Sequence, residues 1–136
     1  MNAVGTALYA RLVGGTALTA LLGDGTAGVY HNRAPEGSTY PLVVFNLQSG
    51  LDDNKSPHRA RQVLYQVKGV SATNMVNAGN IDAAADALLH LSTLAVASPW
   101  QNYWLVREQD VQFEELAPDG QRYYHQGGIY RARIAQ

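Results

Sequence analysis

Residues 110–134 have the sequence DVQFEELAPDGQRYYHQGGIYRARI, and this stretch decides the fold. Its residues 117–120, Ala-Pro-Asp-Gly, form a tight-turn sequence, because proline presets one backbone angle and glycine accepts a positive φ. Apolar and polar residues alternate before the turn, which predicts that Val111 and Phe113 face inward. We therefore expect a C-terminal β-hairpin.

Both arms of this hairpin carry irregular positions. The first arm covers Tyr103–Val106 and Asp110–Leu116, which are either two strands or one long strand interrupted near Glu108. The second arm runs from Arg122 to Ile134. Its Gly127-Gly128 pair predicts a β-bulge or a close approach of another backbone, because glycine has no side chain to pack.

Two more strands are expected earlier in the chain. Leu42–Ser49 is apolar on both faces at its start and on one face later, and Gln62–Val70 presents valine and tyrosine side chains to one face. The polar connection between them, Gly50–Arg61, is long for a compact domain and is therefore expected to be either mobile or functional. Val29-Tyr30 is a candidate short edge strand.

Two helices are expected near the N-terminus. Val4, Leu8 and Leu12 recur at helical spacing, which indicates one amphipathic face. Gly14-Gly15 ends this helix, because glycine takes the left-handed cap conformation without steric cost. A short second helix follows, with Thr16 as its expected N-cap.

The strongest helical pattern lies in Asn80–Leu94. Its apolar residues, Leu91 among them, share one broad face. Asn80 can cap the helix, and Asp82 and Asp86 favour its N-terminal end, where the helix dipole attracts negative charge.

This order of elements predicts an α+β fold, because adjacent pairs of strands are separated by helices. We expect an antiparallel or mixed sheet of about four to five strands, packed by helices on one face and ending in the C-terminal hairpin. Residues 1–136 have the size of a single domain with one hydrophobic core.

Composition limits the classes of function. Charged residues make up only 15% of the chain, below the roughly 25% typical of soluble domains, which suggests that oligomerisation hides part of the surface. The formal net charge of -1 argues against a dedicated duplex-DNA binder. Without cysteine there is no disulfide or thiolate metal site, and no window of about 18 apolar residues could span a membrane.

No residue pattern points to catalysis. Residues 23–28 match Gly-x-Gly-x-x-Gly, but a nucleotide site needs a strand before this pattern and a helix after it, and here a helix precedes it. The histidines lack the spacing of a helical metal pair. Glu114 and Glu115 are adjacent, so in a strand they point to opposite faces and cannot act as a paired acid and base.

Two polar segments are the candidates for contact with another protein. In the polar connection, acidic residues largely cancel a small basic cluster, so ion pairs across a subunit interface fit it better than phosphate binding or a hard-cation site. The candidate contact residues there are Asp52, Asp53, Lys55, His58, Arg59 and Arg61, and those at the hairpin tip are Pro118, Asp119 and Gln121. The many tyrosines in or beside strands fit interface and ordinary sheet packing equally well.

Several motifs occur in a suggestive order: ALTALLG at 17–23, YPLVVF at 40–45, RQVLYQV at 61–67, an alanine-rich helix, and YRARI at 130–134. This order resembles the tail completion or tail terminator family of long-tailed, siphovirus-like phages, prophages and gene transfer agents. The resemblance covers nearly the whole chain, residues 3–134, and rests on the order and spacing of the motifs. The chain departs from the commoner pattern in residues 102–109.

The resemblance implies a structural virion protein, with neither enzymatic activity nor a cofactor. Such proteins assemble as hexameric rings on the last ring of the tail tube, stop its growth and offer a surface to the head-side connector. The implied partners are further copies of the chain, the tail tube protein and the head-side connector or neck protein. DNA would only pass through the lumen. The implied location is the head-proximal end of the virion tail, after assembly in the host cytoplasm.

Two other interpretations stay open at the level of sequence. The chain could be a different structural phage part, such as a neck or head-completion subunit. It could also be a small-ligand-binding or enzymatic α+β domain, which would require a deep pocket with convergent polar groups.

Overall fold

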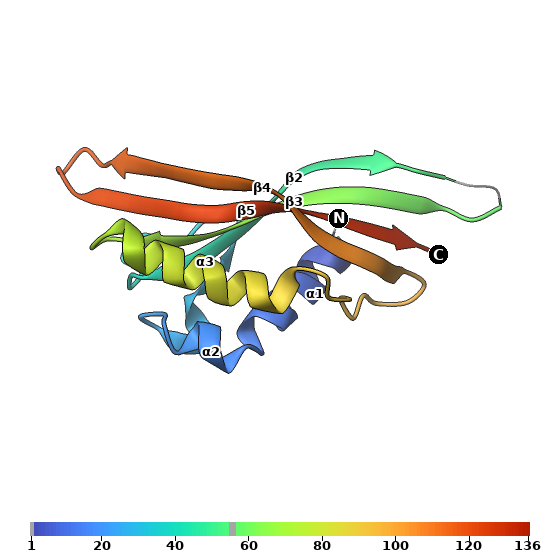
Figure 1. Cartoon of the computed structure of the whole chain (residues 1–136), viewed down its shortest axis with the longest axis horizontal. Coiled ribbons are helices and arrows are strands. Elements are labelled where there is room, and N and C mark those ends of the chain that lie inside the picture. Colours follow the sequence, from blue (N-terminus) through green and yellow to red (C-terminus); the bar gives the residue numbers. More distant parts are fainter. Residues whose placement is uncertain (1, 55–56) are drawn as a thin grey trace.

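Groups of strands are separated by helices along the chain, in the order that the sequence predicts, and together they form an α+β fold (Figure 1). This computed structural model describes residues 2–54 and 57–136. Its elements are α1 (Asn2–Val13), α2 (Thr16–Thr19), the 3-10 helix η1 (Gly25–Gly28), β1 (Val29–His31), β2 (Leu42–Asp52), β3 (Ala60–Ser71), α3 (Met75–Leu89), β4 (Gln101–Leu116) and β5 (Arg122–Ala135).

The strands form one mixed sheet in the order β1-β2-β3-β5-β4. The short strand β1 runs parallel to β2, and the other neighbouring strands are antiparallel. The expected class, the mixed sheet and the C-terminal hairpin β4–β5 are therefore confirmed.

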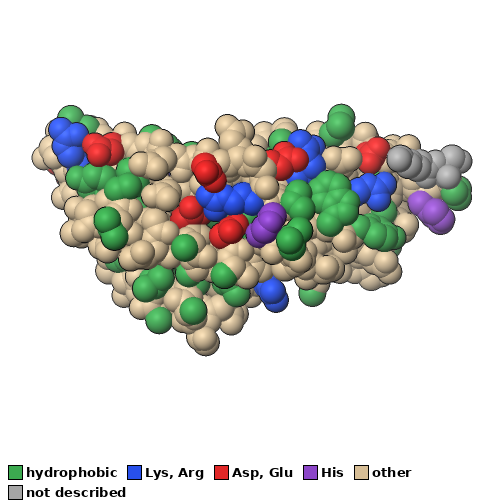
Figure 2. All heavy atoms as spheres, viewed as in Figure 1, with side chains coloured by type: hydrophobic (Ala, Val, Ile, Leu, Met, Phe, Trp, Pro, Cys, Tyr) green, Lys and Arg blue, Asp and Glu red, His purple; other side chains and the backbone are tan. Residues whose placement is uncertain are grey.

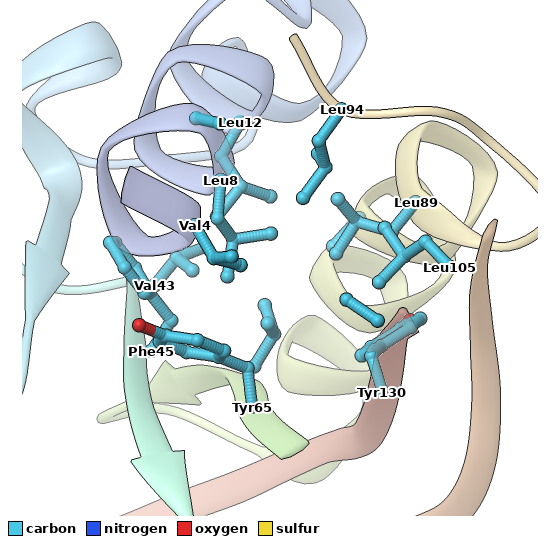
Figure 3. Close-up of a cluster of buried hydrophobic side chains, with 14 of the residues drawn as sticks. Val4, Leu8, Leu12, Val43, Phe45, Tyr65, Leu89, Leu94, Leu105 and Tyr130 are labelled. Atoms are coloured by element: carbon cyan, nitrogen blue, oxygen red, sulfur yellow. The ribbon is translucent and has the colours of Figure 1, made fainter. Parts of the chain in front are cut away.

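The three α-helices lie together on one side of the sheet (Figure 1). Side chains alternate between the two faces of a strand, so every second residue of β2, β3 and β5 meets this helical layer. Figure 3 shows the resulting core, in which α1 and α3 pack their leucines against the aromatic side chains of the sheet. Its fully buried members include Leu8, Leu12, Phe45, Leu89 and Tyr130. We call this the helix-covered face.

The opposite face, here called the open face, carries a smaller apolar cluster. Leu42 and Val44 of β2 and Val70 of β3 are buried there, with Tyr40 and Tyr123 packed against them. The rings of these two tyrosines lie 4.8 Å apart. The prediction that β2 begins buried on both faces is confirmed, and the cover on this side comes from the segment that precedes β2.

The outer strand β4 is one long strand with register shifts between Asn102 and Trp104 and between Arg107 and Gln109. The second shift confirms the irregularity expected near Glu108. It also makes the inward prediction for Val111 and Phe113 wrong, because a one-residue shift moves all later side chains to the other face. Phe113 lies on the open face, 42% exposed, and stacks on His125 at 4.3 Å.

The Gly127-Gly128 pair marks a close backbone approach, since the β5 register continues through it without a shift. A Cβ atom on Gly127 would lie only 2.1 Å from the carbonyl oxygen of Val67. A Cβ atom on Gly128 would lie 2.7 Å from the guanidinium of Arg107. The two glycines thus let the neighbouring strand and an arginine reach the β5 backbone.

The outer edge of β4 is closed along its first half only. The N–H of Leu91 donates to the Leu105 carbonyl at 2.8 Å, and the Arg107 N–H donates to Nδ1 of His90 at 3.1 Å. Among the described residues, no further segment bonds to the outer backbone edge of residues 108–116.

Helix α3 begins and ends earlier than its sequence pattern indicates. Its N-cap is Asn74 instead of Asn80, and the Asn74 side chain accepts a hydrogen bond from the Asn77 N–H at 2.8 Å. The helix ends at Leu89, and Leu91 is 75% exposed with a φ of 61°, so its expected place on the apolar face was wrong. The N-cap prediction for Thr16 was also wrong, because Gly15 occupies that position without a side-chain bond.

Candidate interaction sites at the two hairpin ends

The two segments expected to contact other proteins lie at opposite ends of the elongated subunit. The β2–β3 hairpin forms the right-hand end in Figure 1, and the β4–β5 hairpin forms the left-hand end. The pairings of β2 with β3 and of β4 with β5 hold each connection at the end of a long two-stranded ribbon. The sequence places both segments in connections but does not show that the fold separates them.

The β2–β3 end is more ordered than a long polar loop. Strand pairing continues to Asp52 opposite Arg61, so both ends of the expected connection Gly50–Arg61 belong to strands. Beyond this pair, the Asp53 N–H donates to the Ala60 carbonyl at 2.8 Å, and the Ala60 N–H donates to Oδ1 of Asn54 at 3.0 Å. The sequence prediction ended this strand at Ser49, because glycine, which follows at position 50, is depleted in strands. In the structure β2 continues to Asp52.

Ion pairs at this end form within the subunit. Asp52 lies 3.1 Å from the Nε of Arg61 and 3.8 Å from Arg59, while Asp53 accepts from Arg133 at 3.3 Å. The expected cancellation of charge is therefore local, and the ion pairs seen are intramolecular. His58 is exposed, and Lys55 lies outside the described residues.

The β4–β5 tip is a compact turn. The Ala117 N–H donates to the Gln121 carbonyl at 2.9 Å, and the Asp119 side chain accepts from the Gln121 N–H at 2.9 Å. Gln121 also donates from Nε2 to the Ala72 carbonyl at 3.0 Å, which ties the tip to the segment after β3. Pro118 is exposed at the end of the turn. The tip is thus held in place by side chains that the turn sequence supplies.

Each end exposes large apolar side chains beside its polar residues. Leu51 is 63% exposed at the β2–β3 end, and Leu116 is 62% exposed beside the β4–β5 turn. Figure 2 shows acidic and basic side chains interspersed with apolar ones over the face that it draws. Exposed apolar groups bordered by polar residues are typical of protein–protein contact surfaces.

The helix-covered face contains a buried ionic network that was not predicted from the sequence. Arg107 of β4 donates to both carboxylate oxygens of Asp82 at 2.7 and 2.9 Å, and to Asp110 at 2.8 Å. It also bonds the Tyr130 hydroxyl at 3.2 Å, which in turn donates to Asp86 at 2.8 Å. This network joins α3 to the two C-terminal strands.

The network shifts the acidity of its members. The hydrogen bond to Asp82 raises the pKa of Arg107, against the opposing effect of burial. Burial, followed by the hydrogen bond to Asp86, raises the pKa of Tyr130. The arginine thus stays charged and the tyrosine neutral, and both are held in fixed positions. One feature of the sequence could have indicated this network. Asp82 and Asp86 are four residues apart, so they lie on the same face of helix α3.

Features of ligand sites are scarce in the described part of the chain. Residues 2–54 and 57–136 contain no group of three or more histidine, aspartate or glutamate side chains placed to hold a metal ion. Within the same ranges, none of the helices has the length and apolar character needed to cross a membrane. The glycine-rich residues 23–28 lie in the turn η1 between α2 and β1, the reverse of the order that a nucleotide site needs.

The fold and the two extended hairpins define a class, a small α+β subunit with a mixed five-stranded sheet. A family model described as "Tail completion protein gp17" matches residues 6–131, and the chain belongs to this family. No match was found among curated proteins. One similar solved structure is a chain of the "Virion of native gene transfer agent (GTA) particle", with a TM-score of 0.80 and 15% sequence identity. The alignment covers 99% of this chain and 96% of that one.

Proposed function

We propose that this protein is a tail terminator, whose subunits form a closed hexameric ring on the head-proximal end of a phage-type tail tube. The ring ends polymerisation of the tube and offers the surface on which the head is joined. Membership of the tail completion family supports the tail location, and it is the observation that carries the proposal. The structural likeness supports the fold of such a subunit.

The shape of the subunit supports the ring. A closed ring needs a heterologous interface, in which one patch of each subunit meets a different patch of the next. The two hairpin ends provide two such patches, far apart on one elongated molecule (Figure 1). In this proposal, the β2–β3 end with Leu51 contacts the β4–β5 end with Leu116 of the neighbour, and the exposed leucines become buried.

The partners follow from this arrangement. One face of the ring binds the last ring of the tail tube protein, and the other binds the head-side connector. Asp52, Asp53, Lys55, His58, Arg59 and Arg61 at one end, and Pro118, Asp119 and Gln121 at the other, are the proposed contact residues. DNA passes through the lumen without being held. The proposal assigns no reaction to the subunit.

Cysteine cross-linking tests the ring, because the chain has no cysteine of its own. The variant with Leu51→Cys and Leu116→Cys together is treated with a short bismaleimide linker. We expect a ladder of covalent oligomers that ends at six subunits on a denaturing gel. Either single variant can join at most two subunits and provides the first control.

A matched control places the second cysteine elsewhere. Val76 on α3 is 69% exposed, as open to solvent as Leu116 but on the helical layer. The variant with Leu51→Cys and Val76→Cys should form no ladder. Equal ladders from both double variants would show cross-linking without regard to position, which contradicts a specific contact between the hairpin ends. A wholly monomeric protein in every variant would contradict the ring.

Particles assembled without the protein test its position. Over-long tails or tails without heads are the expected result in negative-stain images, because nothing then stops the tube or joins it. Empty heads that have leaked their DNA would instead identify a neck or head-completion subunit.

A further inference from the structure

A cavity of about 270 Å³ opens on the open face of the sheet. The segment before β2 forms one wall with Arg33 and Tyr40, and strands β3 and β5 form the other with Lys68 and His125. Its base is apolar, made by the small cluster of Leu42, Val44 and Val70 described above. Neither the tail family nor the hairpin ends accounts for this cavity.

Two cations at the cavity have no acidic partner. No carboxylate oxygen of the described residues lies within 4.0 Å of the Arg33 guanidinium or the Lys68 ammonium. Lys68 is half-buried, and its ammonium lies over the ring of Phe113 at 4.9 Å from the centroid. A cation–π contact favours the charge but does not neutralise it. Burial lowers the pKa of Lys68, and the charge of Glu115 offsets only part of this effect.

The one carboxylate at the cavity is already engaged. Oε1 of Glu115 lies 2.9 Å from Nε2 of His125, whose ring is buried between Glu115 and Phe113. Nδ1 of the same ring is buried and has no hydrogen-bond partner. Since burial lowers the pKa of His125, the ring adds a neutral wall to the cavity. The cavity therefore has an excess of positive charge above an apolar base.

We propose that this cavity binds a carboxylate on an apolar stem, carried by an extended segment of a partner protein. The carboxylate lies between Lys68 and Arg33, and the stem packs on Val44 and Val70. An acidic side chain and a C-terminal carboxylate share this chemistry. A phosphodiester fits less well, because its charged group is flanked by polar ester oxygens and carries no apolar stem to pack on Val44 and Val70.

Peptide binding to the isotope-labelled wild-type chain tests the proposal by NMR. The probes are acetyl-Ala-Leu with a free C-terminus, acetyl-Leu-Glu-Leu-amide and acetyl-Ala-Leu-amide. We expect the two acids to shift the His125 ring protons and the signals of residues 68–70, and the neutral amide to bind at least tenfold more weakly. A preference between the two acids tells a C-terminus from a glutamate side chain.

Variants identify the site. Lys68→Met keeps the length of the side chain and removes its charge, so we expect at least a tenfold loss of affinity for the acids, and a smaller loss for Arg33→Met. Arg122→Met is the control, because Arg122 lies on the same strand as His125 but alternates to the other face of the sheet, where it is paired with Glu114 at 3.6 Å. Its affinity should equal that of the wild type.

Three results would overturn the inference. They are equal binding of the acids and the amide, unchanged affinity in Lys68→Met, and displacement of the acids by inorganic phosphate at equal concentration, which would favour a nucleic acid backbone. The assay uses the subunit in solution and needs no ring, so its outcome is separate from that of the cross-linking experiment.

Discussion

The two faces of the sheet differ in whether their buried and half-buried cations are paired with carboxylates. On the helix-covered face, Arg107 is surrounded by Asp82, Asp110 and Tyr130 and is only 16% exposed. On the open face, neither Lys68 nor Arg33 has a carboxylate oxygen of the described residues within 4.0 Å, although Glu115 lines the same cavity. A fully paired charge inside the protein supports one folded arrangement, whereas an unpaired one near the surface remains available to a partner. The charges of the covered face are therefore used within the fold, whereas those of the open face are not paired within it.

The largest expected effect breaks the covered face. Replacing Arg107 by methionine leaves Asp82 buried without its partner, and we expect a loss of about 3 kcal/mol in the free energy of unfolding. Urea denaturation measures it. The double variant with Arg107→Met and Asp82→Leu removes both charges and should recover most of the loss. A single variant as stable as the wild type would show that the network contributes nothing to folding.

A second prediction compares the faces within one strand. Val43 points to the helix-covered face and is 0% exposed, while its neighbour Val44 points to the open face and is 8% exposed. Truncation to alanine should cost about 2 kcal/mol at Val43 and about 1 kcal/mol at Val44, because only the first leaves a cavity that the helices enclose. Thermal unfolding of the two variants provides the comparison. Equal losses would mean that the small open-face cluster is as tightly packed as the main core.

The smallest effect concerns pH and the open face. Burial lowers the pKa of His125 below its ordinary value of 6.5, so the unfolded chain binds a proton more readily than the folded one. Stability should therefore be unaffected above that value and fall as the pH drops below it. Glu115, which favours the charged ring, and Lys68, which opposes it, are the charged groups facing this ring.

The variant His125→Gln isolates this contribution. Its unfolding free energy should fall less than that of the wild type between neutral and mildly acidic pH. Arg107 and its partners remain unchanged in the variant, so the covered face provides the same background in both proteins. Parallel pH profiles would assign the acid sensitivity to other groups.

The sequence predicts the elements of this fold well where a local rule decides them. The turn at 117–120 and the double-sided start of β2 follow from residue types alone. The irregularity near Glu108 could be located from the sequence, but its effect on later residues could not be predicted. The face on which Phe113 lies depends on whether β4 has one extra residue opposite β5 at this point. The N-terminus of α3 was misplaced because Gly79 interrupts a pattern that tertiary packing sustains from Met75 onward.

The candidate sites also divide into those that local sequence rules identify and those that only the fold brings together. The two hairpin ends were identified from polarity and turn chemistry, although the β2–β3 connection proved shorter than the run of polar residues. The Arg107 network and the open-face cavity were not identified, because their members come from α3, β3, β4 and β5 and meet only in the fold. The spacing of Asp82 and Asp86 shows that two carboxylates share one helix face, but no spacing in the sequence shows that Arg107 meets them.

The half-closed edge of β4 has a consequence for the protein before it reaches a tail. An unpaired strand edge invites pairing with the same edge of another copy, which leads to aggregates. The segment from Glu108 to Leu116 carries Glu108, Asp110, Glu114 and Glu115 along that edge. A second copy pairing there would have to crowd these charged side chains and their partners in the same subunit, and charged side chains along a strand edge disfavour such pairing. We therefore expect free subunits to resist fibre-like stacking through this edge.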